Sequence, residues 1–333
     1  MLFIIFAGML REFHPNFDKM DELSQKKVPF FFMVDFLMEN VDIFLEDEIT
    51  KSGLLINFQN FKNLGAQQER PEKITFESFP QNEEDYRKGF DLVQKNLKSG
   101  NSYLTNFTCK TRVKTNLTLE EIFYLSHSKY KVLYPDRFVF FSPETFVEIV
   151  DDIIFTHPMK GTIDAGAENA VEILKNDDKE KAEHYTVVDL LRNDLSIVAD
   201  EVKLDEFQRI DFIRTHEKNL YAMSSEISGT LKPEFRGRMG SVMKTLLPAG
   251  SILGAPKAKT LEIVLEAENY SRGYYTGVCG WFDGKNLDSC VMIRFIEKEN
   301  TKLYFKSGGG ITHLSKAADE YQEMKNKIYV PIY

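Results

Sequence analysis

Short apolar runs rich in aromatic residues recur along this chain, and their length limits what it can fold into. Residues 30–36 and 53–58 are two such runs, bounded by polar or turn-forming residues, which is typical of β-strands. Further strands are predicted at residues 103–110, 138–150, 152–156, 273–282, 289–296 and 302–307. Helical spacing of apolar residues predicts helices at residues 83–98, 178–195 and 315–330. We therefore expect an α+β protein whose sheets carry glycine-rich loops.

The bulk composition is that of an ordinary globular protein and excludes two classes of partner. The chain has 333 residues, 43% hydrophobic and 28% charged, with a net charge of −9. An acidic chain has no basic field with which to hold nucleic acid or an anionic membrane surface. Its three cysteines, Cys109, Cys279 and Cys290, are few and lack metal-ligand spacing, which is typical of a protein in the reducing cytoplasm.

The first ten residues form an apolar segment whose role has to be decided before the fold is considered. The segment is too short to span a bilayer, which takes about 20 residues. It also lacks the positive leading segment and the cleavage site of a signal peptide. We interpret residues 1–19 as an over-long extension and Met20 as the true start of the protein.

Two pairs of glutamates share a spacing that places both members of each pair on one helix face. Glu180 and Glu183 are three residues apart in one predicted helix, and Glu320 and Glu323 repeat this spacing in another. If the two faces meet, their charge requires a cation, and carboxylate oxygens suit Mg²⁺. The alternative is that both pairs are solvated, as charged helix residues usually are. Polar residues 192–194, which a purely structural helix would not need, favour a metal site.

Glycine-rich segments and two basic residues are further candidates for a binding site. Residues 247–257, LPAGSILGAPK, predict a tight turn and a helix start, where backbone N–H groups can approach an anion. Residues 308–310, GGG, predict a second loop after a strand. Arg294 lies in a predicted apolar strand, where its partner is either a substrate carboxylate or a structural ion pair. Lys160 enters a predicted turn, as either a solvated surface charge or a reactive group.

Eight stretches of the chain, in this order, resemble the chorismate-utilising enzyme family. They are SPETF (142–146), HPMKGT (157–162), EHYTVVDLLRNDL (183–195), LPAGSILGAPK (247–257), RGYYTGVCGW (272–281), the strand around Arg294, GGGI (308–311) and EYQEMKNK (320–327). The resemblance implies large antiparallel sheets that form a β-sandwich core flanked by helices. It also implies a single chorismate-binding domain over residues 20–333, with 20–80 a reduced N-terminal subregion and 83–328 the catalytic core.

Lys160 distinguishes members of this family by the product they form. Anthranilate synthases that resemble this chain carry alanine at this place, whereas 4-amino-4-deoxychorismate synthases commonly carry lysine. Isochorismate and salicylate synthases use a lysine where this chain has Leu104, which argues against addition of water. A family histidine that is linked to pyruvate elimination is replaced here by Ala222, which favours a product that keeps its enolpyruvyl group.

The resemblance therefore implies conversion of chorismate and ammonia to 4-amino-4-deoxychorismate, in the 4-aminobenzoate branch of folate synthesis. The alternatives are anthranilate synthesis and a non-catalytic chorismate-binding subunit. Because no glutaminase region is present, we expect ammonia from a separate glutamine amidotransferase subunit.

The resemblance also assigns roles to individual residues. Glu144 matches the family acid, which protonates the 4-hydroxyl as it leaves. Lys160, if neutral, would add at C2 while hydroxide leaves C4; if charged, it would assist electrostatically. Glu183 and Glu323 would touch Mg²⁺ directly or through water, with Glu180 and Glu320 behind them. Positions that match substrate contacts are Gly161, Thr162, Ser251, Tyr275, Arg294, Gly309 and Gly310.

Overall fold

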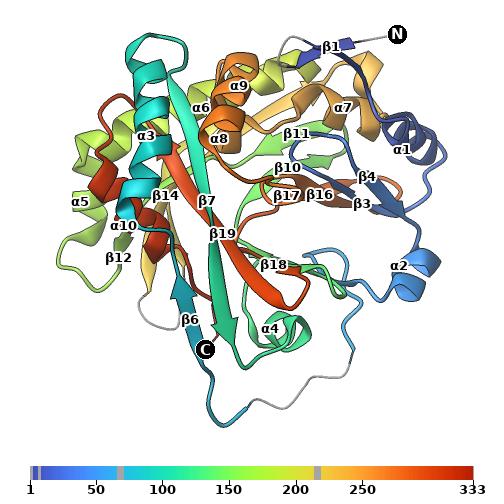
Figure 1. Cartoon of the computed structure of the whole chain (residues 1–333). Coiled ribbons are helices and arrows are strands. Elements are labelled where there is room, and N and C mark those ends of the chain that lie inside the picture. The colour runs from blue at the N-terminus through green and yellow to red at the C-terminus, as the bar shows by residue number, and fades with distance from the viewer. Residues whose placement is uncertain (1–2, 7–8, 66–70, 214–218, 333) are drawn as a thin grey trace.

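The computed structural model describes residues 3–6, 9–65, 71–213 and 219–332, and within them the strands form two large antiparallel sheets (Figure 1). The first sheet contains β12 (Met159–Asp164), β13 (Ala199–Ile213), β14 (Leu220–Leu231), β11 (Ile153–Thr156), β10 (Thr145–Val150), β17 (Leu287–Val291), β16 (Val278–Phe282), β3 (Phe30–Val34) and β4 (Val41–Phe44). The second contains β15 (Gly254–Ala255), β6 (Phe76–Phe79), β7 (Leu104–Thr115), β19 (Lys302–Ile311), β18 (Phe295–Glu299), β9 (Phe138–Ser142), β8 (Tyr130–Tyr134) and β5 (Leu55–Asn57). A separate hairpin joins β1 (Phe3–Phe6) to β2 (Met9–Glu12).

The helices cover the outer faces of the two sheets. They are α1 (Asn16–Gln25), α2 (Glu46–Ser52), α3 (Glu83–Lys98), α4 (Leu119–Leu125), α5 (Ala170–Asn176), α6 (Asp178–Val198), α7 (Met239–Leu246), α8 (Gly250–Leu253), α9 (Lys257–Ala267) and α10 (Ala317–Asn326). The helix predicted at residues 83–98 is confirmed at both ends, and the Asn82 side chain caps its start by accepting from Asp85 N at 2.8 Å. The helix predicted at residues 315–330 is shorter in the structure, where α10 ends at Asn326. The residues that follow pack against the rest of the protein instead of continuing the helix.

Alternation along β3 shows why this chain forms a sandwich. All five residues of β3 are buried. Phe30, Phe32 and Val34 belong to the core that packs on α1, α6 and α7. Phe31 and Met33 point the other way, into the core between the two sheets. A strand that is apolar on both faces requires cover on both sides, so the sheet lies between helices and a second sheet.

The other faces of the second sheet follow the same rule. Aromatic residues of β9 alternate, with Phe138 and Phe140 facing the first sheet and Phe141 facing outward. The outer face is covered by α3, α4 and α10, and in Figure 1 α3 runs beside β7. The molecule therefore has helices outside, two sheets inside and a dry aromatic core between the sheets.

The chain passes from one sheet to the other at two places that carry predicted site residues. Glu144 lies between β9 of the second sheet and β10 of the first. Arg294 lies between β17 of the first sheet and β18 of the second, with φ of +54°. Val291 N donates to Glu144 O at 3.1 Å, so the two crossings lie side by side. The hydrogen bonds between strands end where the chain changes from one sheet to the other. The side chains of Glu144 and Arg294 therefore lie at the edge of the sandwich.

The N-terminal region contributes to the packed structure. Met20 lies inside α1 and is fully buried, as is Phe17 three residues earlier. Translation from Met20 would therefore remove the first turn of α1, and this start stays a prediction. Of the helices that the structure describes, none combines the length and the apolar character needed to cross a membrane.

Candidate active site

A cavity of about 610 Å³ brings most of the predicted site residues together. It lies between α6, which packs on β12, and α10, which packs on β19. The predicted residues that line it are Glu144, Gly161, Glu180, Glu183, Ser251, Tyr275, Arg294, Gly309, Gly310, Glu320 and Glu323. Residues from eight separated stretches of sequence thus share one hollow, which supports a single binding site.

The segment predicted as a turn around Lys160 is a strand, so this prediction is wrong in its local structure. Residues 159–164 form β12, which pairs with β14 and carries a register shift between Lys160 and Thr162. Gly161 occupies the shift with φ of +79°, and a Cβ there would lie 2.9 Å from Glu180 Oε2. Glycine therefore permits both the bulge and the close approach of a carboxylate. The side chains of Lys160 and Thr162 lie outside the described part of the structure.

The two glutamate pairs face this cavity from different helices. Glu180 and Glu183 belong to α6, whereas Glu320 and Glu323 belong to α10. A Cβ on Gly309 would lie 3.2 Å from Glu323 Oε1 and 3.7 Å from Glu320 Oε2. The α10 carboxylates therefore lie close to the glycine strand, and a side chain at Gly309 would crowd the Glu323 carboxylate.

These carboxylates fit a hard cation by their chemistry, because they are all oxygen donors that line one cavity. Among the described residues, however, no group of three or more histidine, cysteine, aspartate or glutamate side chains is gathered closely enough to hold a metal ion. Lys327 Nζ contacts Glu323 Oε1 at 2.7 Å and donates to Gly308 O at 2.8 Å. This ammonium offsets part of the acidic charge on the α10 side.

The predicted loop at residues 308–310 is also a strand. The three glycines belong to β19 and pair with residues 106–108 of β7. A Cβ on Gly308 would lie 2.3 Å from Phe107 O, so that position has no space for a side chain. The absence of side chains at Gly309 and Gly310 exposes sheet backbone to the cavity, which lets a ligand approach its polar groups.

Arg294 departs from the predicted strand interior because the chain changes sheet there. Its Nη1 donates to Lys327 O at 3.2 Å, and its guanidinium lies 5.0 Å from the Tyr329 ring centroid. Both contacts hold the arginine against the C-terminal segment while it lines the cavity. A fixed guanidinium in a cavity suits a planar carboxylate.

Glu144 is held by a neighbouring loop as well as by its own crossing. Ser251 Oγ donates to Glu144 Oε1 at 2.9 Å, and the Glu144 backbone N donates to Ser142 Oγ at 3.1 Å. Ser251 belongs to α8, within the predicted helix-start segment, and both residues line the cavity. Two of the predicted site residues are therefore in direct contact.

A buried ion pair joins two elements that contribute residues to the cavity lining. Arg272 Nη2 contacts Glu268 Oε1 at 2.6 Å, with the two side chains 1% and 2% exposed. The same guanidinium donates to Ile252 O and to Asn106 O, so it ties α8 to β7. Three residues further on, burial raises the pKa of Tyr275, which keeps its hydroxyl protonated beside the cavity.

Replacing Arg272 with methionine is expected to lower the free energy of unfolding by about 3–5 kcal/mol, because Glu268 would be left as an unpaired buried charge. Urea unfolding measures this loss. The matched control is Arg192→Met, whose side chain is 54% exposed and pairs with Asp189 at the surface. That change should cost no more than about 0.5 kcal/mol, and equal losses in the two variants would contradict the structural role given to Arg272.

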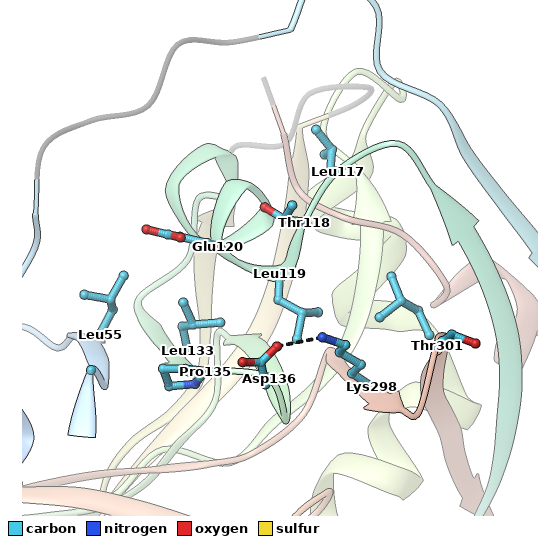
Figure 2. Close-up of a pocket in the computed structure, with 12 residues that line it drawn as sticks. Leu55, Leu117, Thr118, Leu119, Glu120, Leu133, Pro135, Asp136, Lys298 and Thr301 are labelled. Atoms are coloured by element: carbon cyan, nitrogen blue, oxygen red, sulfur yellow. Dashed lines mark hydrogen bonds and ion pairs between the residues drawn. The ribbon is translucent and has the colours of Figure 1, made fainter.

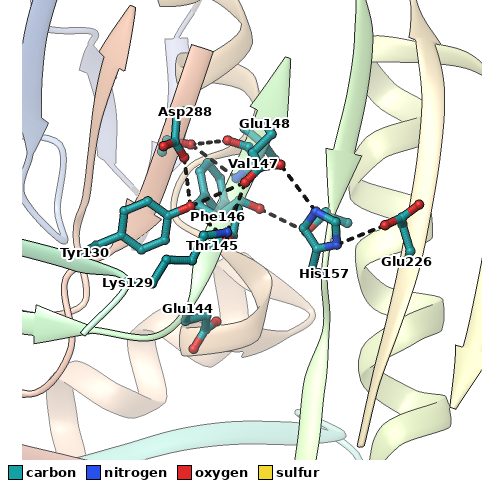
Figure 3. A network of polar contacts seen from close by, with 12 residues as sticks. Lys129, Tyr130, Glu144, Thr145, Phe146, Val147, Glu148, His157, Glu226 and Asp288 are labelled. Carbon is teal, nitrogen blue, oxygen red and sulfur yellow. Dashed lines mark hydrogen bonds and ion pairs between the residues drawn. The ribbon is translucent and has the colours of Figure 1, made fainter. Parts of the chain in front are cut away.

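A polar network not predicted from the sequence adjoins the cavity (Figure 3). His157 lies between two carboxylates, 3.6 Å from Glu148 Oε2 through Nε2 and 3.6 Å from Glu226 Oε2 through Nδ1. His157, with a further contribution from Lys129, lowers the pKa of Glu148 to about 2 against the opposing effect of burial. Further in, burial raises the pKa of Asp288 to about 6 although Tyr130 donates to it. His157 is the first residue of the segment HPMKGT (157–162), which carries Lys160. Its two carboxylate contacts therefore hold this segment at its start.

Figure 2 shows a second cavity, of about 510 Å³, at the other end of β19 beside α4. Leucines form much of its wall, together with an ion pair in which Lys298 Nζ lies 2.6 Å from Asp136 Oδ1. Its lining contains none of the predicted site residues. The chemistry of the chain therefore points to the first cavity.

Among the cavity residues that were not predicted from the sequence, Lys327 and His157 differ in the signal that could have revealed them. Lys327 lies four residues after Glu323 on the same side of the helix end, so i, i+4 spacing was a usable signal. His157 had no such signal, because its two carboxylate partners come from other strands.

Comparison with known proteins identifies the family of this chain and agrees with its fold. Residues 42–332 match the chorismate binding enzyme family, and the chain belongs to that family. Uncharacterized PabA-like proteins of Pasteurella multocida and Haemophilus influenzae are 46% and 45% identical to it, over 96% and 95% of this chain and 99% and 96% of their own lengths.

More distant relatives include proteins with named activities. Anthranilate synthase component 1 of Saccharomyces cerevisiae is 34% identical over 53% of this chain and 35% of its own length. The crystal structure of anthranilate synthase component I from Streptococcus pneumoniae superimposes with a TM-score of 0.70 at 19% identity, covering 96% of this chain and 86% of that chain. The predicted family and the α+β chorismate-binding fold are confirmed.

Proposed function

We propose that this protein is the synthase subunit that exchanges the 4-hydroxyl of chorismate for an amino group, forming 4-amino-4-deoxychorismate. The observation that carries the proposal is the meeting of Glu144, Arg294 and the four helical glutamates in one cavity, along whose wall runs the strand that bears Lys160. Lys160 in place of alanine favours this product over anthranilate. Because part of the chain is similar in sequence to anthranilate synthase component 1, anthranilate formation is the second candidate.

The cavity residues divide the chemistry among them. Arg294 and the backbone of Gly309 and Gly310 bind and orient substrate oxygens. Glu144 gives its proton to the departing hydroxyl, which leaves as water, while the neutral amine of Lys160 adds at C2. Ammonia then adds at C4 and Lys160 leaves C2. The ammonium formed at C4 returns a proton to Glu144, so the net change is chorismate plus ammonia to aminodeoxychorismate plus water.

The α6 and α10 carboxylates, Glu180, Glu183, Glu320 and Glu323, would hold Mg²⁺ against this cavity. When bound, the ion supplies a template for the ring carboxylate and offsets negative charge. The lysine must be neutral to act as a nucleophile, and a nearby cation favours that form.

Ammonia would come from a separate glutamine amidotransferase subunit. We place the reaction in the cytoplasm, in 4-aminobenzoate and folate synthesis. Cys109, Cys279 and Cys290 are all buried free thiols, as suits a reducing compartment.

The deciding experiment incubates the pure protein with chorismate, Mg²⁺ and ammonium and identifies the product by mass spectrometry. An amino product that retains its enolpyruvyl mass is expected, and its formation should stop with chelator and resume with added Mg²⁺. Release of pyruvate with a fluorescent aromatic product means anthranilate synthesis. Magnesium-dependent chorismate binding without turnover at high ammonium means a non-catalytic subunit.

A further inference from the structure

Asp194 is a buried carboxylate near the cavity that the proposed chemistry does not use. It lies on α6 and is 9% exposed. Its Oδ2 lies 2.9 Å from Nζ of Lys257, the first residue of α9. The same ammonium donates to Leu246 O at 2.8 Å, at the end of α7. One ion pair thus joins three helices around the segment between α7 and α9.

That segment contains α8, and Asp194 touches it directly. The Gly250 backbone N–H donates to the Asp194 carboxylate. A Cβ on Gly250 would lie 2.8 Å from Asp194 Oδ2 and 3.1 Å from the Leu190 side chain, so α8 is pressed onto α6 without a spacer. A helix of four residues has little stability of its own. Its position is therefore set by the contacts that surround it.

The residue after Gly250 is the one that reaches the predicted acid. Ser251 Oγ donates to Glu144 Oε1 at 2.9 Å. On the other side, Arg272 Nη1 donates to Ile252 O at 3.1 Å. The residues on both sides of Ser251 are thus held in place: Gly250 by Asp194, which pairs with Lys257, and Ile252 by Arg272.

We infer that Asp194, paired with Lys257, is a positioning residue that holds the Ser251 hydroxyl against Glu144. The inference rests on the proposed function in one respect, the role of Glu144 as the general acid. Burial raises the pKa of Asp194, while Lys257 and the Gly250 N–H oppose that shift. The same partners that Asp194 positions thus stabilise its ionised form. Loss of that charge should weaken the contacts that hold α8 in place.

The test compares Asp194→Asn, Ser251→Ala and the double variant in steady-state kinetics with ammonium. Displacing a catalytic contact costs on the order of 10- to 100-fold in rate, so we expect such a fall in kcat for Asp194→Asn. If Asp194 acts through Ser251, the double variant is no slower than Ser251→Ala. The matched control, Asp189→Asn, changes an exposed aspartate of the same helix and should leave kcat unchanged.

A pH profile separates positioning from general stabilisation. The Ser251 hydroxyl favours the ionised Glu144, so its loss or displacement should move the high-pH limb of kcat to higher pH. The same upward shift is expected in Asp194→Asn and Ser251→Ala. The inference is wrong if the losses in kcat of the two single variants multiply in the double variant. It is also wrong if the high-pH limb of kcat does not shift in Asp194→Asn.

Two further arms cover other outcomes. If Asp194→Asn does not fold, Asp194→Asn with Lys257→Met removes both charges together and is tested in the same cycle. The wild-type product alone decides the proposed function, whereas the inference is decided by relative rates whichever product forms. If the wild-type protein only binds chorismate, the same cycle is measured on Kd, with non-additive weakening expected and multiplying effects contradicting the inference.

Discussion

Replacing Lys160 with alanine is expected to lower the rate of amination by roughly 10³-fold or more, a loss typical of removing a nucleophile. In the proposed reaction the lysine amine opens the route to C4 by bonding first at C2. Folding should be unaffected, because β12 keeps its backbone pairing with β14. The measurement is aminodeoxychorismate formation under saturating ammonium and Mg²⁺.

Intact-protein mass spectrometry makes this prediction specific to a covalent step. Without ammonia, wild-type protein given chorismate should gain the mass of chorismate minus water, and Lys160→Ala should not. Lys175→Ala, at an exposed position of α5, is the matched control and should keep both rate and adduct. If Lys160→Ala aminates chorismate as fast as the wild type, the proposed covalent role is wrong. If Lys160 acts only electrostatically, the variant should be slow and the wild-type protein should form no adduct.

Replacing Glu144 with glutamine is expected to lower kcat by about 10²–10⁴-fold with little change in KM, because the amide cannot protonate the leaving hydroxyl. The glutamine oxygen can still accept the hydrogen bond from Ser251, so the geometry of the crossing is kept. Steady-state kinetics over a range of pH measures the effect.

The pH dependence identifies the missing proton. In the wild type, activity should fall at high pH as the acid loses its proton, and in Glu144→Gln this limb should disappear. Glu266→Gln, at an exposed position of α9, is the matched control and should keep the wild-type profile. A Glu144→Gln enzyme with the wild-type rate and an unchanged limb would assign the acid to another residue.

The local elements of the fold were largely predictable. Helix 83–98 follows from apolar spacing and the Asn82 cap, and β3 follows from a short run of apolar residues. The glutamate spacing also predicted that each pair shares a helix face. These properties depend on neighbours a few residues apart, so the sequence contains them directly.

Apart from the over-long helix predicted at residues 315–330, the errors named above concern glycine or a change of direction. The glycines at 308–310 and at Gly161 predicted turns, yet both lie in strands. At Gly308 the backbone of β7 leaves no room for a Cβ, and Gly161 has a positive φ and lies close to the Glu180 carboxylate. Arg294 was expected inside one strand, but the chain crosses between the sheets there. Local patterns cannot distinguish a glycine required by a turn from one required by contact with a distant strand.

By itself, the sequence determined most of the helices and strands and which carboxylates share a face, because those depend on backbone preference and side-chain period. Only the tertiary structure decided that two helices far apart in the sequence face one cavity and that Glu144 and Arg294 lie at sheet crossings. It also decided that His157 lines that cavity and that Asp194 contacts the segment carrying Ser251. Those placements arise from pairing between strands far apart in sequence, whose register is set by burial of both faces of each sheet.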